Sequence, residues 1–268
     1  MAHFKILIEY EGTRYSGWQV QKNARTVQGE IMNSLHTVFP KEQIDFAGSG
    51  RTDAGVHALM QAAHLDVKTV LAPEIIRMKV NDLLPADINI LDVLKAPPRF
   101  NARHDAVARS YLYQISRRRT AFGKRFVWWV KDSLDVERMR KAAGVFRGMN
   151  DFRSFTADDP DEKSTRVLLD EVAIREAGDL ILIRFLGSHF LWKMVRQLVG
   201  ILAESGRGTM PPEQIRAMLD GHSDVPAQYT APPSGLFLER VYYPGEEFLP
   251  EPVPVMEIAA FRAGRSAG

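Results

Sequence analysis

The succession strand, helix, strand, strand, helix, strand occurs twice along this chain, once before and once after the Pro97-Pro98 pair. In the first half, residues 4–10 alternate apolar and polar side chains, a period of two that is typical of a half-buried strand. Apolar residues at helical spacing follow Thr26, which we expect to cap a helix that ends before Pro40. The sequence therefore predicts two related βαββαβ domains of the α+β class, with antiparallel sheets flanked by helices.

The remaining elements are predicted from the same periods and from the positions of Gly and Pro. Further strands are expected over residues 44–47, 60–67 and 88–93, and over 107–116, 167–175, 180–186 and 235–243. Further helices are expected over residues 73–84, after Asp135, and over 190–204 and 212–219. We therefore divide the chain into an N-terminal domain of residues 1–104, a C-terminal domain of residues 105–246 and a loosely packed tail of residues 247–268.

The composition excludes several classes of site. The 268 residues include no cysteine, which excludes a disulfide framework, a thiolate metal site and a cysteine nucleophile, and fits a reducing cytoplasm. The seven histidines show no ligand-like spacing and there is no nucleotide-binding fingerprint, so we expect neither a metal nor a cofactor. The chain starts without a signal-peptide pattern, and no apolar run approaches the ~18 residues that a membrane span needs.

Residues 48–58 form a glycine-rich loop between two expected strands, with the sequence Gly-Ser-Gly-Arg-Thr-Asp-Ala-Gly-Val-His-Ala. Glycines at this density allow turns with positive φ and let the backbone come close to a bound molecule. Asp53 is the single carboxylate of the loop, and Arg51 lies two residues away. A nearby arginine favours the ionised form of a carboxylate, which suits a nucleophile better than a general acid.

Three interpretations of this loop compete. The first is a structural glycine-rich turn that carries a surface Asp–Arg pair. The second, a phosphate-binding loop, is excluded by the spacing. A P-loop needs Lys-Ser or Lys-Thr after its second glycine, and a dinucleotide fingerprint needs a glycine where Asp53 stands. The third is a loop that presents a catalytic aspartate.

A basic tract covers residues 99–125, with eight Lys or Arg against one acid, Asp105. Such a tract is either a solvated basic face or a surface that meets a partner of opposite charge, for which phosphate is the usual candidate. Four aromatic residues lie within it: Phe100, Tyr111, Tyr113 and Phe122. They favour RNA, because unpaired bases are held by stacking together with phosphate contacts.

Residues 50–58 resemble the active-site motif of the tRNA pseudouridine synthase A family. Arg-Ser-Tyr-Leu-Tyr at 109–113 is similar to the second motif of that family, and residues 190–196 are similar to its Phe-Leu-x-x-Met-Val-Arg motif. Segments 148–155 and 231–238 match as well, so the resemblance runs from about residue 4 to residue 243. One departure is the Trp192-Lys193 pair, where many relatives have a polar or His-containing pair.

The resemblance implies a role for each of five residues. Asp53 is the nucleophile, and Arg196 pairs with it and keeps it ionised. Tyr111 stacks on the target base and is a candidate for removing its proton at C5, while Leu238 lines the base pocket. Arg51 fills the space that the base leaves. Asp53, Tyr111 and Arg196 should lie around one cleft between the two domains.

Taken without the resemblance, two of these side chains have other interpretations. A tyrosine at position 111, in an expected strand, is as often a core or cross-strand residue. Arg196 and Lys193 are three residues apart, so they are expected to share one flank of the 190–204 helix, where such a pair is by default solvated.

The implied activity is the isomerisation of uridine to pseudouridine at nucleotides 38, 39 and 40 of tRNA, in the anticodon stem-loop, on a base flipped out of its stack. The resemblance implies no cofactor and no metal, and a homodimer that grips one tRNA. Two other classes remain open. A non-catalytic RNA-binding protein would keep the basic tract but would not need Asp53. A small-molecule glycosidase or transferase would need a second catalytic carboxylate, for which the sequence offers no convincing candidate.

Overall fold

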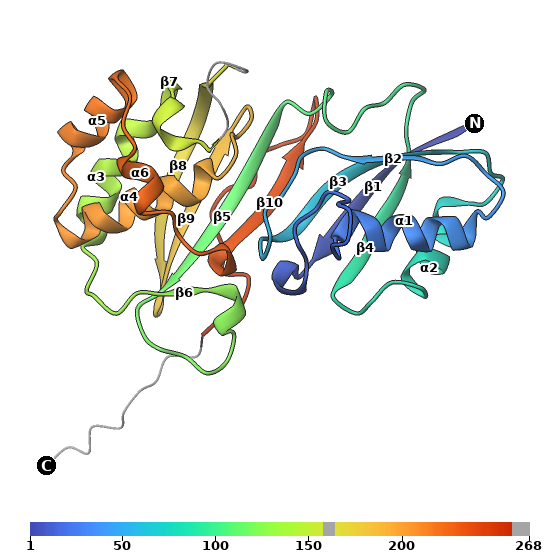
Figure 1. Ribbon diagram of the computed structural model, residues 1–268, viewed down its shortest axis with the longest axis horizontal. Helices are drawn as coiled ribbons and strands as arrows, with labels where there is room; N and C mark the ends of the chain where they lie inside the picture. Colours follow the sequence, from blue (N-terminus) through green and yellow to red (C-terminus); the bar gives the residue numbers. More distant parts are fainter. Residues whose placement is uncertain (158–163, 259–268) are drawn as a thin grey trace, which may run out of the picture.

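The computed structural model describes residues 1–157 and 164–258, and within them ten strands form one continuous sheet (Figure 1). The strands are β1 (Ala2–Tyr10), β2 (Asp45–Gly48), β3 (His57–Val67), β4 (Ile88–Lys95), β5 (Ala108–Ser116), β6 (Trp128–Trp129), β7 (Gly148–Asp151), β8 (Arg166–Ala177), β9 (Leu180–Gly187) and β10 (Leu236–Tyr242). Eight of them follow the order β4-β1-β3-β10-β5-β9-β8-β7, while β2 pairs with β3 and β6 with β5. The sheet is mostly antiparallel, so the predicted α+β class is confirmed.

Two groups of helices flank the sheet, one beside each half (Figure 1). The helices are α1 (Val27–Val38), α2 (Pro73–Asn81), α3 (Val136–Phe146), α4 (Met194–Arg207), α5 (Pro212–Asp220) and α6 (Val225–Gln228). Two N-caps occur where the sequence predicts them: the Thr26 side chain accepts a hydrogen bond from the Gly29 N–H, and Asp135 accepts one from the Arg138 N–H. Each cap satisfies a backbone donor at the start of its helix.

The two halves share one sheet because the last strand of the chain returns between them. β10 pairs antiparallel with β5 and, over a short parallel stretch, with β3, where Phe237 lies beside His57 and Leu238 beside Ala58. Two separate apolar cores remain, and Leu236 packs into the C-terminal core while Leu238 packs into the N-terminal one. The two halves are therefore joined by strand pairing within one sheet. Two independent sheets would be joined only by a linker.

Helix α4 begins at Met194, four residues later than the predicted start at residue 190. Lys193 has a φ of 60°, in the left-handed region, so the helix cannot extend back through it. Phe190 and Leu191 pack against the C-terminal core. Because they are apolar, the sequence pattern predicts that they belong to the helix. The prediction that Lys193 and Arg196 share one flank of the helix is therefore wrong, because only Arg196 lies on the helix.

In the described part of the C-terminal tail, residues 247–258, Pro252 is the one buried residue, and the partly buried Val255 and Ile258 pack against the sheet. Side chains alternate across a strand, so Tyr113 faces the helices while Leu112 faces the opposite side of the sheet. Val255 and Ile258 pack against the apolar cluster of Leu112 on that side. The Val255 N–H also donates to Gln114 Oε1 over 2.8 Å. The rest of the predicted tail, residues 259–268, lies outside the described residues.

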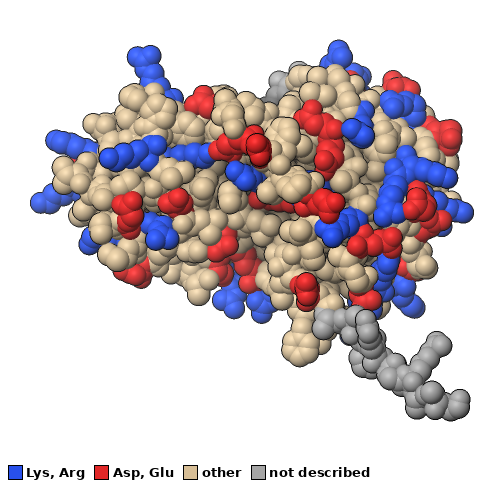
Figure 2. Space-filling model, turned by 180° about the vertical axis from the view of Figure 1, so that it is seen from behind, with Lys and Arg blue, Asp and Glu red and all other residues tan. Residues whose placement is uncertain are grey.

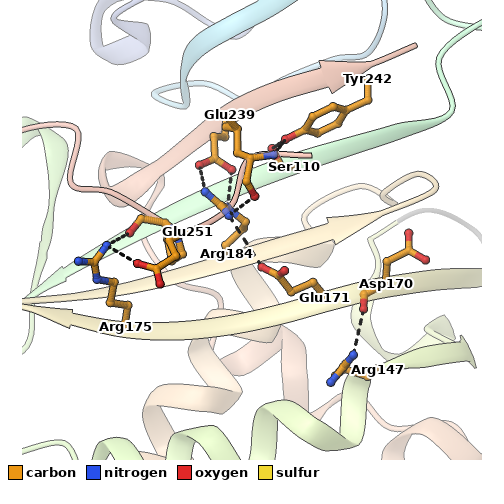
Figure 3. A network of polar contacts seen from close by, with 11 residues as sticks. Ser110, Arg147, Asp170, Glu171, Arg175, Arg184, Glu239, Tyr242 and Glu251 are labelled. Atoms are coloured by element: carbon orange, nitrogen blue, oxygen red, sulfur yellow. Dashed lines mark hydrogen bonds and ion pairs between the residues drawn. The ribbon is translucent and has the colours of Figure 1, made fainter. Parts of the chain in front are cut away.

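A buried ion pair lies beneath this segment (Figure 3). Arg184 on β9 donates from Nε and Nη2 to the two carboxylate oxygens of Glu239 on β10, both over 2.8 Å, and the two residues are only 2% and 4% exposed. Its Nη1 donates to the carbonyl oxygen of Leu249 over 3.1 Å. A buried guanidinium needs such partners, since an unpaired charge in the interior is costly. The pair thus fixes β10 and the tail segment together.

Candidate active site

A cavity of about 1060 Å³ lies between the two halves, and both contribute to its lining. The N-terminal half supplies the loop between β2 and β3, residues 49–56, which we call the Asp loop. The C-terminal half supplies β5, β10 and the turn before α4. The structure places all five residues to which the sequence assigns a role in this lining: Arg51, Asp53, Tyr111, Arg196 and Leu238.

The Asp loop is held from below by side chains of the N-terminal core. The Tyr10 hydroxyl and the Thr52 hydroxyl share a hydrogen bond of 2.8 Å. Gln61, fully buried on β3, donates to the Gly50 carbonyl oxygen over 3.2 Å. The Trp18 N–H donates to the Thr52 carbonyl oxygen over 3.1 Å. These bonds satisfy loop backbone and side-chain groups, so the position of the loop is fixed by the core.

Two glycines allow the segment of residues 12–17 to lie directly against the Asp loop. A Cβ on Gly12 would stand 1.9 Å from the Val56 carbonyl oxygen, which no side chain could tolerate. Gly17 has a φ of 95°, and a Cβ there would stand 2.6 Å from the Thr52 carbonyl oxygen. The sequence places these glycines in a polar loop but offers no spacing that assigns them this supporting position.

Asp53 and Arg196 form an ion pair across the cavity. Arg196 Nη1 donates to Asp53 Oδ2 over 3.1 Å, well inside the ~6 Å within which one charge strongly affects another. The side chains are 16% (Arg196) and 23% (Asp53) exposed, so water screens the pair only in part. Arg196 Nε donates to the Ala231 carbonyl oxygen over 2.7 Å, which fixes the guanidinium before it meets the carboxylate. The carboxylate is therefore held in one orientation.

Trp192 contacts the other oxygen of the same carboxylate, a contact that the sequence does not predict. Its Nε1–H donates to Asp53 Oδ1 over 3.1 Å. The turn made by Lys193, in the left-handed conformation, carries Trp192 toward the Asp loop instead of along α4. The only signal in the sequence is that Trp192 departs from the residue type common in the resembling motif.

Tyr111 and Leu238 are direct partners between β5 and β10, so their side chains lie on one face, at the floor of the cavity. The Phe190 ring meets the Tyr111 ring edge to face, with centroids 4.9 Å apart. Burial raises the pKa of Tyr111 to about 12, with an opposing effect from Arg109 and a smaller raising effect from Asp53. The phenol is therefore neutral at physiological pH.

Arg51 lies on the exposed rim of the cavity. In the first of the three interpretations of the loop, Arg51 and Asp53 form a surface pair. Among the described residues, the guanidinium that bonds Asp53 is that of Arg196, from the other half of the protein. Arg51 is exposed, and no described carboxylate lies within ion-pair distance of it.

The basic tract is not the uncompensated surface that its sequence indicates. Arg117 pairs with Glu176, and Arg118 pairs with Asp179 over 2.8 Å, both acids being on or beside the β8–β9 hairpin. Lys and Arg are interspersed with Asp and Glu on the face seen in Figure 2. The one-sided charge count of residues 99–125 therefore misses acids that the fold brings in from elsewhere.

Other arginines of the tract lie at the cavity itself. Arg109 donates from its guanidinium to the carbonyl oxygens of Arg103, Ala106 and Ser188, so it organises backbone near the cavity. Arg103 and Arg109 both line the cavity. Arg117 and Arg118 do not line it.

His57 connects the end of the Asp loop to the C-terminal half on the side away from the cavity. Its Nδ1 accepts a hydrogen bond from the Gly12 N–H over 3.0 Å, and its Nε2 lies 3.0 Å from the Arg125 carbonyl oxygen. The first bond requires an unprotonated Nδ1, so Nε2 carries the hydrogen and donates. The ring stacks on Phe237, with centroids 4.8 Å apart. Burial lowers the pKa of His57.

In residues 1–157 and 164–258, no three His, Cys, Asp or Glu side chains are placed to hold a metal ion. Over the same residues, no helix has the length and apolar character that crossing a membrane requires.

Comparison with known proteins gives a consistent result. The family model described as tRNA pseudouridine synthase matches residues 6–105 and 142–244. The tRNA pseudouridine synthase A of Geotalea uraniireducens is 40% identical over 91% of this chain and 100% of its own length. Those of Exiguobacterium sibiricum and Aquifex aeolicus are each 37% identical, over 91% and 90% of this chain and 98% and 99% of their own lengths.

The His57 contacts predict an acid-dependent loss of stability. As the pH falls below the ordinary histidine pKa of about 6.5, His57 becomes protonated in the unfolded chain but stays neutral in the folded protein, where its pKa is lowered. The free energy of unfolding should therefore fall with pH through this window. We expect His57→Gln, which keeps a donor toward Arg125, to lack this contribution. Urea unfolding of the wild type and of His57→Gln at pH 7.5 and pH 5.5 measures this contribution. The assignment would be contradicted if the difference in the free energy of unfolding between the two proteins were the same at both pH values.

Proposed function

The chain belongs to the tRNA pseudouridine synthase family, and from this premise we propose that it modifies uridines 38, 39 and 40 in the anticodon stem-loop of tRNA. The reaction is an isomerisation of uridine to pseudouridine. The bond from N1 of uracil to C1′ of ribose breaks, the base turns, and C5 bonds to C1′ in its place. The observation that carries the proposal is the Asp53 carboxylate, fixed by Arg196 inside a cavity floored by Tyr111.

Asp53 acts as the nucleophile in this proposal. Its ionised carboxylate attacks an electron-poor carbon, of the sugar or of the uracil ring, as carboxylates do in glycoside hydrolysis. Breaking the N1–C1′ bond leaves its electron pair on the base. The bond that Asp53 formed to carbon breaks again before product release, and its electron pair returns to the carboxylate. After the new C5–C1′ bond forms, C5 loses a proton and N1 gains one, so atoms and charge balance without an oxidant or a cofactor.

Arg196 holds the nucleophile in one orientation. Its bond to the Ala231 carbonyl oxygen fixes the guanidinium, and its bond to Asp53 Oδ2 fixes the carboxylate. A preorganised charge in a partly dry cavity stabilises an anion with no reorganisation at the moment of reaction.

Tyr111 stacks on the extruded base and takes part in proton transfer at C5, beside Leu238, which lines the base pocket. The raised pKa of about 12 leaves a neutral phenol, so it accepts the proton only while passing its own onward. Arg51, exposed at the rim, fills the space that the base leaves in the stem. Flipping the base costs a few kcal/mol of unstacking, and such a replacement offsets part of that cost.

We further propose a homodimer in the cytoplasm that holds one tRNA, and two domains at residues 1–104 and 105–246. The dimer and the cytoplasmic location rest on the family resemblance and on the absence of cysteine. The domain division rests on the two separate apolar cores, with β10 shared between them. A non-catalytic RNA-binding protein is the alternative, and it would have no use for a carboxylate fixed by Arg196 in a cavity.

Replacing Asp53 should abolish pseudouridine formation. Asp53→Asn and Asp53→Ala remove the nucleophile, so the rate should fall by about 10⁴-fold or more while tRNA binding and folding persist. The matched control is Asp45→Asn, an exposed carboxylate on β2 outside the cavity. Purified protein is incubated with tRNA, and pseudouridine at nucleotides 38–40 is quantified. Near-normal pseudouridine from Asp53→Ala would disprove the mechanism, and none from the wild type would disprove the function.

Tyr111→Phe separates proton transfer from stacking. The variant keeps the ring but loses the hydroxyl, so kcat should fall by about 10²-fold or more while tRNA affinity stays near that of the wild type. Tyr229→Phe, an exposed tyrosine that does not line the cavity, is the control. Single-turnover rates and tRNA binding are measured for both variants. Full turnover by Tyr111→Phe would leave Tyr111 with a stacking role alone.

A further inference from the structure

Both oxygens of the Asp53 carboxylate are engaged in the structure, which raises the question of how the nucleophile becomes available. Arg196 bonds Oδ2 and Trp192 bonds Oδ1, each over 3.1 Å. An atom attacked by a carboxylate oxygen must first come within about 3–3.5 Å of it. The indole nitrogen of Trp192 already lies at that distance from Oδ1. The indole therefore occupies one of the directions from which a reacting carbon could approach Oδ1.

The two donors differ in how firmly they are held. Arg196 is anchored at a second point by the Ala231 carbonyl oxygen, lies on helix α4, and is largely buried. Trp192 is 50% exposed, an unusual state for so large an apolar ring. The indole is therefore the more exposed of the two donors.

The backbone around Trp192 is fixed, so only its side chain needs to move. The Trp192 carbonyl oxygen accepts hydrogen bonds from the Ala157 N–H and the Thr156 hydroxyl. Lys193 holds a left-handed φ, an unfavourable conformation for a non-glycine residue that persists only where its surroundings impose it. The Lys193 ammonium lies 4.8 Å from the centre of the indole. Rotation about the side-chain bonds of Trp192 would uncover Oδ1 without moving this turn.

We propose that Trp192 is a removable cap on the nucleophile: its indole bonds Asp53 Oδ1 in the free enzyme and swings away when the extruded uridine enters. This inference rests on the proposed role of Asp53 as the nucleophile. The hydrogen bond stabilises the free enzyme but not the transition state, so it reduces kcat/KM instead of raising it. Trp192 is in this account a positioning residue that governs access to Oδ1.

The cap predicts an unusual gain of function. Trp192→Phe keeps an aromatic ring but removes the indole donor, so kcat/KM for tRNA should rise about two- to tenfold through a lower KM, since a net hydrogen bond is of modest strength. Trp129→Phe, an exposed tryptophan outside the cavity, should retain wild-type kinetics. If Trp192 instead orients Asp53 throughout the reaction, Trp192→Phe would lower kcat, and the cap would be disproved.

Fluorescence gives a second, independent readout. The emission of Trp192 is obtained by subtracting the emission spectrum of Trp192→Phe from that of the wild type. This difference spectrum should change when tRNA is added, but not when the tRNA transcript lacks the anticodon arm. An identical difference emission with and without tRNA, from enzyme that forms pseudouridine, would overturn the cap alone. Absence of pseudouridine with the wild type would overturn the proposed function and the cap with it.

Discussion

The contact between Asp53 and Arg196 depends on residues 143 positions apart in the chain being brought to 3.1 Å, and the rest of the fold serves to hold that distance. Asp53 stands on a loop of the N-terminal half, and Arg196 on a helix of the C-terminal half. The two halves are kept in register because β10, the last strand, pairs with both β3 and β5. A continuous sheet is stiff, so the two charges meet in a fixed geometry rather than by chance closure of two domains.

Contacts on the side of the sheet away from the cavity stabilise the pairing of β10 with both halves. His57 joins the Gly12 N–H to the Arg125 carbonyl oxygen immediately behind the Asp loop. The buried pair of Arg184 and Glu239 joins β9 to β10 and to the tail segment. These contacts are polar and directional, and a buried polar group without a partner is costly, so they favour one arrangement of the strands over a slipped one. The cavity is therefore supported from behind.

The sequence allowed prediction of most elements, because their apolar periods and caps are local signals, such as Thr26 and Asp135 before their helices. It did not reveal that β10 joins the halves, since strand pairing across the chain has no local signature. The start of α4 was misplaced, because the left-handed backbone of Lys193 is invisible in an apolar run. Asp53 and Arg196 were found through motifs, whereas the Trp192 bond depends on a turn geometry that no spacing encodes.

Turnover of Arg196→Met tests most directly whether the ion pair fixes the nucleophile. The variant keeps an unbranched apolar side chain but leaves Asp53 without its guanidinium partner, so kcat should fall by about 10²-fold or more while tRNA binding persists. The control is Arg207→Met, at the other end of α4 and outside the cavity. It removes ion pairs to Asp132 and Glu204 and should keep the wild-type kcat. A kcat of Arg196→Met within twofold of the wild type would contradict the account.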